Sequence, residues 1–230
     1  MSTRYRAFRS EALSASTITT VMDSSARRVL RNTYMLLAMC LGFSALTASL
    51  SVTLQLPYPG ILLTLIGFYG LYFLIIKNRN SGAGVALCFA LTGFMGYTIG
   101  PLIGLYMNTP NGGQTVATAL GGTALVFITM SAYGLVSKRD LSFMGNMLFI
   151  GLMVAFFASL AALFLQIPAL HLAVSALFVL LSSCMIMFET NNIVRGGETN
   201  YILATVTLFV SIYNIFVSLL QILGFANSSD

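Results

Sequence analysis

The chain has 230 residues, of which 57% are hydrophobic and only 7% are charged, and its formal net charge is +5 at pH 7. A soluble domain carries about a quarter charged residues because its surface faces water. The composition therefore excludes a soluble domain of this size and predicts a polytopic membrane protein. The basic residues lie in the N-terminal tail and in short links between apolar runs, which argues against nucleic-acid binding.

The first predicted element is an N-terminal tail over residues 1–26, which contains no sustained apolar run. The tail is rich in Ser and Thr and carries three early arginines, so we expect it to be flexible. An Arg- and Ser-rich start is also typical of a mitochondrial transit peptide, and this alternative stays open. Asp23 or Ser24 would cap a helix leading into the first apolar run, near lipid headgroups.

Seven apolar runs follow the tail. A helix needs about 20 residues to cross the hydrocarbon core of a bilayer. The runs cover residues 32–54, 60–76, 83–106, 114–136, 141–165, 169–189 and 201–224. We therefore predict an all-α membrane protein, with a seven-helix transmembrane domain over 27–225 and a short C-terminal tail over 226–230.

The basic residues predict the orientation of these spans, because all eleven fall on one side of a seven-span arrangement. They occupy the segment before the first run and the links after the second, fourth and sixth runs: Arg4, Arg6, Arg9, Arg27, Arg28, Arg31, Lys77, Arg79, Lys138, Arg139 and Arg195. Basic links face the cytoplasm in membrane proteins. The N-terminus is thus expected in the cytoplasm and the C-terminus in the periplasm.

The third run contains a glycine pattern that favours close helix packing. Gly96, Gly100 and Gly104 are spaced by four residues, so they line one helix face that another helix can approach closely. Pro101 lies between them and is expected to kink the helix and to free a backbone carbonyl near its middle.

Polar side chains follow helical spacing in three of the runs and so form stripes. The stripes consist of Ser44, Thr47 and Ser51 in the first run, Ser175, Ser182 and Glu189 in the sixth, and Thr207, Ser211, Asn214, Ser218 and Gln221 in the seventh. Polar groups in lipid are costly, so the stripes should face one another or water. Interhelical hydrogen bonding is one interpretation, and a hydrated path is the other.

The sequence offers no catalytic or metal-binding pattern. Cys40, Cys88 and Cys184 lie inside apolar runs without ligand spacing, and we interpret them as small buried apolar residues. His171 has no Cys or acidic neighbour and is a poor metal ligand candidate. We therefore expect a protein that is not an enzyme and that holds no metal or cofactor.

The most polar stretch after the first run is FETNNIVRGGETNY, residues 188–201. Glu189 is expected at the cytoplasmic end of the sixth span, and Gly196 and Gly197 should stop any helix. Glu198 lies at the expected start of the seventh helix, where a carboxylate is favoured by the helix dipole. Arg195 is placed to pair with either glutamate.

Several stretches of the chain resemble the transmembrane Bax-inhibitor-motif family, and most closely its bacterial YccA branch. They are RNTYMLL at 31–37, PGILLTLIGFYGL at 59–71, ALGGTALVF at 119–127, SAYGLVSKRDLSFMG at 131–145, LQIPALHLAVSALF at 165–178 and FETNNIVRGGETNYILATVTLFVSIYNIFVSLLQILGF at 188–225. The resemblance implies a seven-helix fold in which six helices surround a more central seventh.

Two functions come with the resemblance. The YccA branch is described as a substrate and modulator of FtsH, the ATP-dependent membrane protease, and so implies FtsH and its associated membrane proteins as partners in the bacterial inner membrane. Other members are described as pH-sensitive calcium leak channels, controlled by two acidic residues near the cytoplasmic ends of the last two spans. That alternative implies calcium or protons as the transported ions.

The motif of the channel members is only half present. Glu189 fills the first acidic position, whereas Ser211 stands at the second, in LFVSIYN, where the family has an aspartate. Two close carboxyls can share a proton and act as a pH switch, and a Glu–Ser pair cannot. Glu189 is either an exposed, merely structural residue or a buried, functional one, and a bond to Ser211 or Asn214 is a further alternative to pointing toward water. The pattern therefore favours the protease modulator, with the leak channel as the alternative.

Overall fold

The structure is a computed structural model that describes residues 2–137, 139–165 and 167–227, with side chains from Ser24 onward, Leu163 excepted. Its elements are the helices α1 (Ser2–Thr53), α2 (Ile61–Asn78), α3 (Gly82–Met107), α4 (Gly112–Val136), α5 (Met144–Leu165), α6 (Pro168–Val194) and α7 (Tyr201–Asn227). Seven helices in the described part of the chain are long and apolar enough to cross a membrane, which confirms the predicted fold class.

From the second span onward, the predicted bounds agree with the helices to within a few residues, except at the end of α6 and the start of α5. The helix α6 continues five residues beyond the predicted end at 189, because polar residues there contact neighbouring helices instead of leaving the bundle. The helix α5 begins at Met144 and not at 141, because Asp140 and Ser142 form a hydrogen-bonded turn just before it.

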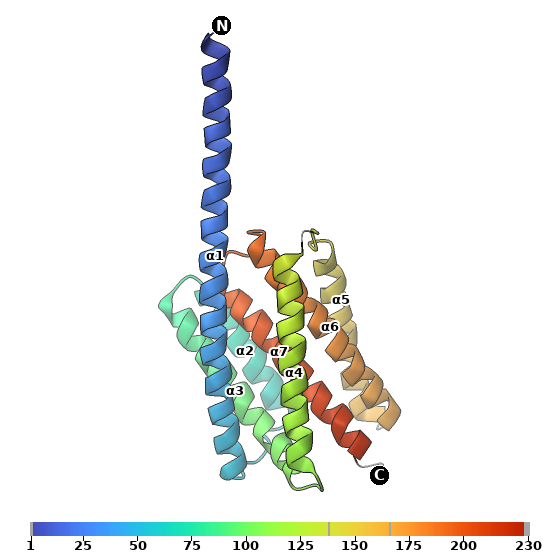
Figure 1. Cartoon of the computed structure of the whole chain (residues 1–230). Helices are drawn as coiled ribbons and strands as arrows, with labels where there is room; N and C mark the ends of the chain where they lie inside the picture. The colour runs from blue at the N-terminus through green and yellow to red at the C-terminus, as the bar shows by residue number, and fades with distance from the viewer. Residues whose placement is uncertain (1, 138, 166, 228–230) are drawn as a thin grey trace.

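The N-terminal segment is a helical extension of α1 that projects beyond the bundle (Figure 1). The backbone is therefore helical where we expected an irregular tail. A helix that leaves the bundle needs no apolar face, so the lack of an apolar period does not prevent it. The flexibility of the segment stays a prediction.

The helix α7 lies at the centre of the bundle, where 61% of its most apolar window is buried, more than in any other described span. It contacts α1, α2, α3, α4 and α6, whereas α5 packs only against α6 (Figure 1). The central position of α7 is thus confirmed, but the expected ring of six helices around it is wrong at α5, which is peripheral.

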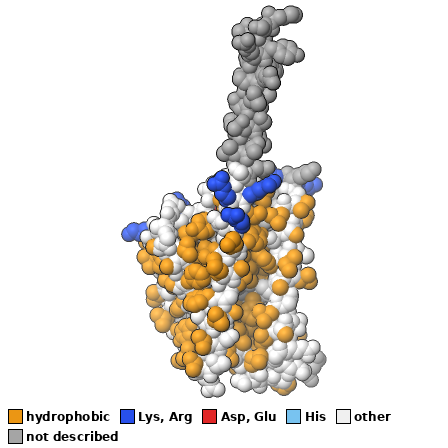
Figure 2. Space-filling model, turned by 60° about the vertical axis from the view of Figure 1, so that its left-hand side comes forward, with side chains coloured by type: hydrophobic (Ala, Val, Ile, Leu, Met, Phe, Trp, Pro, Cys, Tyr) orange, Lys and Arg blue, Asp and Glu red, His pale blue; other side chains and the backbone are white. Residues whose placement is uncertain are grey.

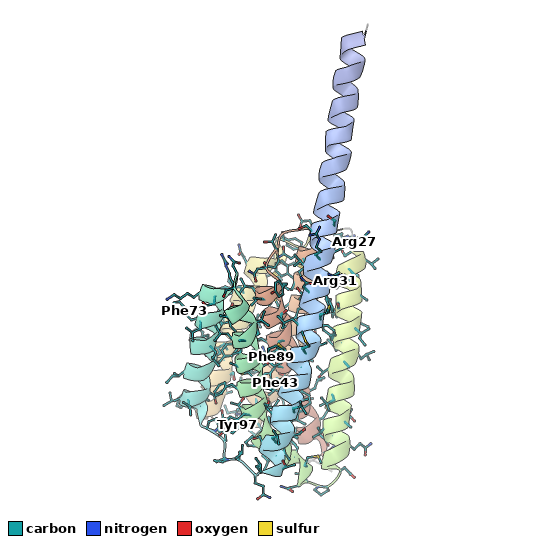
Figure 3. The ribbon with its side chains drawn as sticks, turned by 90° about the vertical axis from the view of Figure 1, so that its left-hand side faces the viewer. Arg27, Arg31, Phe43, Phe73, Phe89 and Tyr97 are labelled. Carbon is teal, nitrogen blue, oxygen red and sulfur yellow. The ribbon has the colours of Figure 1, made fainter. Side chains whose placement is uncertain are left out.

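The most extensive helix contact in the described bundle is between α1 and α3, and two of the predicted glycines lie in it. A side chain at Gly96 would overlap Ser44 and Thr47 of α1, and one at Gly100 would overlap Ser51. Nothing lies within 4 Å of a side chain built at Gly104, so the prediction that this third glycine packs against a helix is wrong. Aromatic residues continue the seam, with the rings of Phe43 and Phe89 edge to face, 5.7 Å between centroids (Figure 3).

The α1–α3 seam also satisfies the carbonyl that Pro101 frees. Because proline lacks an N–H, the carbonyl of Tyr97, four residues earlier, has no partner within α3. The hydroxyl of Ser51 donates to that oxygen at 3.1 Å, from α1. This contact confirms the predicted free carbonyl and assigns a role to one residue of the first polar stripe.

We expect Ser51→Ala to lower the free energy of unfolding by about 1 kcal/mol, because the Tyr97 carbonyl loses its partner. In a Pro101→Ala background residue 101 regains an N–H, so the same substitution should cost less than half as much. Unfolding of the four variants in detergent measures this coupling. If Ser51→Ala lowers the free energy of unfolding equally in both backgrounds, the proposed coupling of Ser51 to Pro101 is wrong.

Basic side chains gather at the end of the bundle from which α1 projects (Figure 2). The links after α2, α4 and α6 lie at the same end (Figure 1). The structure thus brings together the basic links that the sequence assigned to one side of the membrane.

Candidate functional site

The stretch 188–201 forms the end of α6, a tight turn and the start of α7. Its polar residues do not unwind α6, which ends only at Val194. Gly196 has a φ of 75°, a left-handed conformation that suits glycine, and its N–H donates to Ile193 O at 3.0 Å. The predicted helix stop at this glycine pair is confirmed.

Asn200 caps α7 and connects the turn to the link between α2 and α3 by hydrogen bonds. Its side-chain oxygen accepts hydrogen bonds from the N–H groups of Ile202 and Leu203, both at 3.1 Å. Its amide donates to Arg79 O and to the side-chain oxygen of Asn80, both at 2.9 Å. Glu198 accepts from the Asn200 N–H at 2.6 Å, so this carboxylate stabilises the turn at the positive end of α7.

Glu189 is buried inside the bundle, with 6% of its surface exposed. Among the described residues its Oε1 atom has no hydrogen-bond partner. Tyr72 of α2 and Glu198 of the turn lie close enough to interact electrostatically with this carboxyl. The buried interpretation of Glu189 is therefore correct, and the exposed one is wrong.

Glu189 makes no hydrogen bond to Ser211 or Asn214 in the described structure. Between the same two helices, Ser175 of α6 donates to Gln221 of α7 at 2.8 Å. The Ser211 hydroxyl donates to Thr207 O at 2.9 Å. Ser211 thus bonds within its own helix, in place of the expected bond to Glu189.

The polar stripes of α6 and α7 face one another, as predicted, and they do so in two ways. The Ser175–Gln221 hydrogen bond joins α6 to α7 directly. Asn214 and Ser218 instead line a cavity of about 320 Å³ between α2, α5, α6 and α7, together with His171. Hydrogen bonding between helices therefore accounts for part of the stripe on α7, and the hydrated path stays a prediction for the part that borders this cavity.

Asn191 is a residue that the sequence analysis did not single out. Its side chain is buried, and its amide donates to Gly134 O and Ser137 O at the end of α4, both at 3.2 Å. Its oxygen accepts from Nε of Arg195 at 3.1 Å. The side chain therefore joins α4, α6 and the turn. Its position two residues after Glu189 gives no signal of these long-range contacts.

Arg195 also lies near the link between α4 and α5. The hydroxyl and the backbone N–H of Ser142 hold the pKa of Asp140 below its usual range, and the charge of Arg195 lowers it further. The α4–α5 link and the α6–α7 turn thus share one charged face. Arg195 also donates to Asn191 there, and its predicted pairing with a glutamate stays a prediction.

We expect Asn191→Ala to lower the free energy of unfolding by about 2–3 kcal/mol, because two carbonyls of α4 lose their buried donor. The neighbouring Asn192→Ala is a matched control and should change stability by less than about 0.5 kcal/mol. The midpoint of thermal unfolding in detergent checks both. Equal effects at the two asparagines would contradict the assigned role.

Comparison with known proteins assigns a family to this arrangement. The family model described as "Inhibitor of apoptosis-promoting Bax1" matches residues 26–228. The Modulator of FtsH protease YccA of Escherichia coli K12 is 56% identical over 203 residues, covering 88% of this chain and 92% of the relative. A protein of another E. coli strain with the same identity is named Inner membrane protein YccA. An uncharacterized protein of Pseudomonas aeruginosa is 54% identical, over 88% of this chain and 91% of its own.

Proposed function

The chain belongs to the Bax1 inhibitor family, and from this premise we propose that it is a non-enzymatic inner-membrane protein that binds and modulates the membrane protease FtsH. The observation that carries the proposal is the 56% identity to a protein named for that role, over 88% of this chain. The seven apolar helices support a multi-pass location in the inner membrane.

The architecture suggests which segment of such a modulator the protease binds and why the bundle resists degradation. We infer from the basic end of the bundle that the N-terminus faces the cytoplasm. Residues 2–23 would then extend toward a cytosolic ATP-driven protease, which needs an accessible chain end. The extension continues into α1, and α1 is held by the close seam with α3. A force that the protease applies to the extension would therefore act on the α1–α3 seam.

Reconstitution tests the proposed modulation. Purified FtsH, ATP and a membrane-protein substrate of FtsH are placed in proteoliposomes with or without this protein. We expect the half-life of the substrate to lengthen several-fold when the protein is present. An unrelated seven-span protein at the same density is the control. Unchanged degradation, with the protein intact in the vesicles, would overturn the proposal.

A pH-sensitive leak for calcium or protons is the second candidate, and one observation favours it. Glu189 is buried and its Oε1 atom lacks a hydrogen-bond partner in the described structure. Such a carboxyl is a candidate for proton binding. A leak would give calcium or proton flux in proteoliposomes that changes with Glu189→Gln. Flux equal to that of protein-free vesicles would contradict the leak function.

A further inference from the structure

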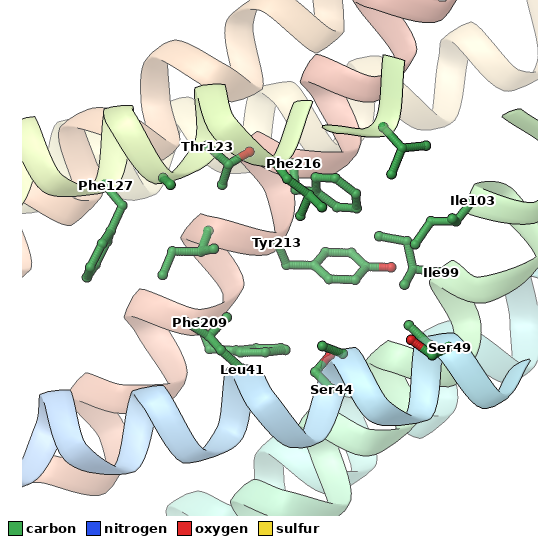
Figure 4. Close-up of a pocket in the computed structure, with 16 residues that line it drawn as sticks. Leu41, Ser44, Ser49, Ile99, Ile103, Thr123, Phe127, Phe209, Tyr213 and Phe216 are labelled. Carbon is green, nitrogen blue, oxygen red and sulfur yellow. The ribbon is translucent and has the colours of Figure 1, made fainter. Parts of the chain in front are cut away.

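A cavity lies between α1, α3, α4 and α7, separate from the polar residues of the α6–α7 turn. Its volume is about 470 Å³, and its lining is mostly apolar, with Phe127, Phe209, Ile212 and Phe216 prominent (Figure 4). No charged side chain lines it in the described structure. Volume and lining are typical of pockets that hold small apolar ligands.

The cavity opens toward lipid between α1 and α4. These two helices have no backbone contact in the described structure, and their residues at the cavity rim are exposed: Ala45 and Ser49 on α1, Leu120 and Ala124 on α4. At the arginine-rich end the gap is closed, because the Tyr34 hydroxyl bonds Ser131 of α4. Access is therefore from the bilayer, in the half away from the arginines.

Tyr213 of α7 places a hydroxyl inside this apolar space (Figure 4). The hydroxyl lies 3.5 Å from the Thr98 hydroxyl, beyond the usual 2.5–3.0 Å of an O–H···O bond. Thr98 already donates to Met95 O at 2.9 Å. The Tyr213 hydroxyl is thus a poorly satisfied donor in an apolar cavity, and an incoming oxygen atom would satisfy it.

We propose that this cavity binds the apolar chain of a membrane lipid that carries an uncharged oxygen, of the ester or ketone type. The chain would enter between α1 and α4 and lie against the aromatic residues of α7. The Tyr213 hydroxyl would donate to the lipid oxygen. A lining without charged residues disfavours a charged headgroup inside the cavity, since an unpaired buried charge is costly.

The place of the opening favours a lipid chain as the occupant. Along α4 the cavity runs from Val116 to Phe127, a length of about 16 Å. Its opening lies between two membrane-spanning helices, so the chains of membrane lipids are the molecules that face it. Its lining is mostly apolar and carries no charged side chain in the described structure, which suits such a chain. This inference goes beyond the proposed protease function and does not depend on it.

Photolabelling tests the proposal with a stated probe, the methyl ester of palmitic acid carrying a diazirine on its chain. The full-length protein in detergent is irradiated with the probe, and labelled residues are mapped by mass spectrometry. We expect one saturable site, with label on cavity residues such as Leu120 and Phe127. The unesterified acid should compete several-fold less well than the ester, because it is charged at neutral pH.

Substitutions inside and outside the cavity test whether the probe binds at this site. Ala124→Phe fills the cavity from α4 and should lower labelling about ten-fold. Ala132 lies on the same helix, is also exposed and is outside the cavity, so Ala132→Phe should leave labelling unchanged. Tyr213→Phe keeps the shape and should weaken probe binding about five-fold through the lost hydrogen bond. Label spread evenly over lipid-facing residues, or binding unaffected by Tyr213→Phe, would overturn the proposal.

Discussion

We expect deletion of residues 2–23 to lengthen the half-life of the protein several-fold in proteoliposomes that contain FtsH and ATP. These residues form the part of α1 that projects beyond the bundle (Figure 1). The bundle itself has short links, so it offers a pulling enzyme little accessible chain elsewhere in the described structure. Removing the projecting segment leaves the membrane part of α1, which starts at Ser24, and should therefore leave folding intact.

The control for this deletion is the opposite end of the chain. Removal of residues 228–230 should leave turnover unchanged, because the proposed topology places them on the other side of the membrane. Thermal unfolding of both variants verifies that the bundle is intact. If the N-terminal deletion and the full-length protein are degraded at the same rate, the projecting segment is not the point of attack.

The substitution Gly96→Ala should lower the free energy of unfolding by about 1–3 kcal/mol through overpacking of the α1–α3 seam. A methyl group at this position would overlap the Ser44 carbonyl oxygen and the Thr47 hydroxyl. The backbone oxygen cannot move away without separating the helices. The same substitution at Gly104 meets open space, and it should stabilise the protein by about 0.5 kcal/mol because alanine restricts the unfolded chain.

The two alanine variants should therefore shift the midpoint of thermal unfolding in opposite directions. The seam also bears on turnover, because α1 connects it to the projecting segment. Gly96→Ala should accelerate degradation by FtsH when residues 2–23 are present and have little effect when they are deleted. A Gly104→Ala variant as unstable as Gly96→Ala would contradict the assignment of the seam to the first two glycines.

The sequence predicts most of the fold because lipid contact imposes a simple rule on composition. Each span must be apolar and about 20 residues long, so the seven helices and their basic links can be read directly. The freed carbonyl and the glycine face of α3 are predictable as well, because the backbone properties of Pro101 and Gly100 do not depend on distant residues.

The contacts and cavities that the sequence did not predict depend on which helices pack together. The hydropathy of each span carries no information about that. Asn191 reaches α4 across 57 residues of sequence, and Gly104 fails to meet α1 although its spacing matches that of Gly96. The peripheral place of α5 and the cavity at Tyr213 are likewise consequences of three-dimensional packing. For Glu189 the sequence predicted a choice between burial and exposure, and only the packing of α6 decided it.

The measurement that tests the central claim most directly is identification of the proteins that co-purify with the tagged protein from native membranes in mild detergent. An unrelated seven-span protein at the same expression level is the control. We expect FtsH and its membrane partners to be enriched with this protein over the control. Recovery of intact protein without enrichment of FtsH would contradict the proposal that it binds and modulates this protease.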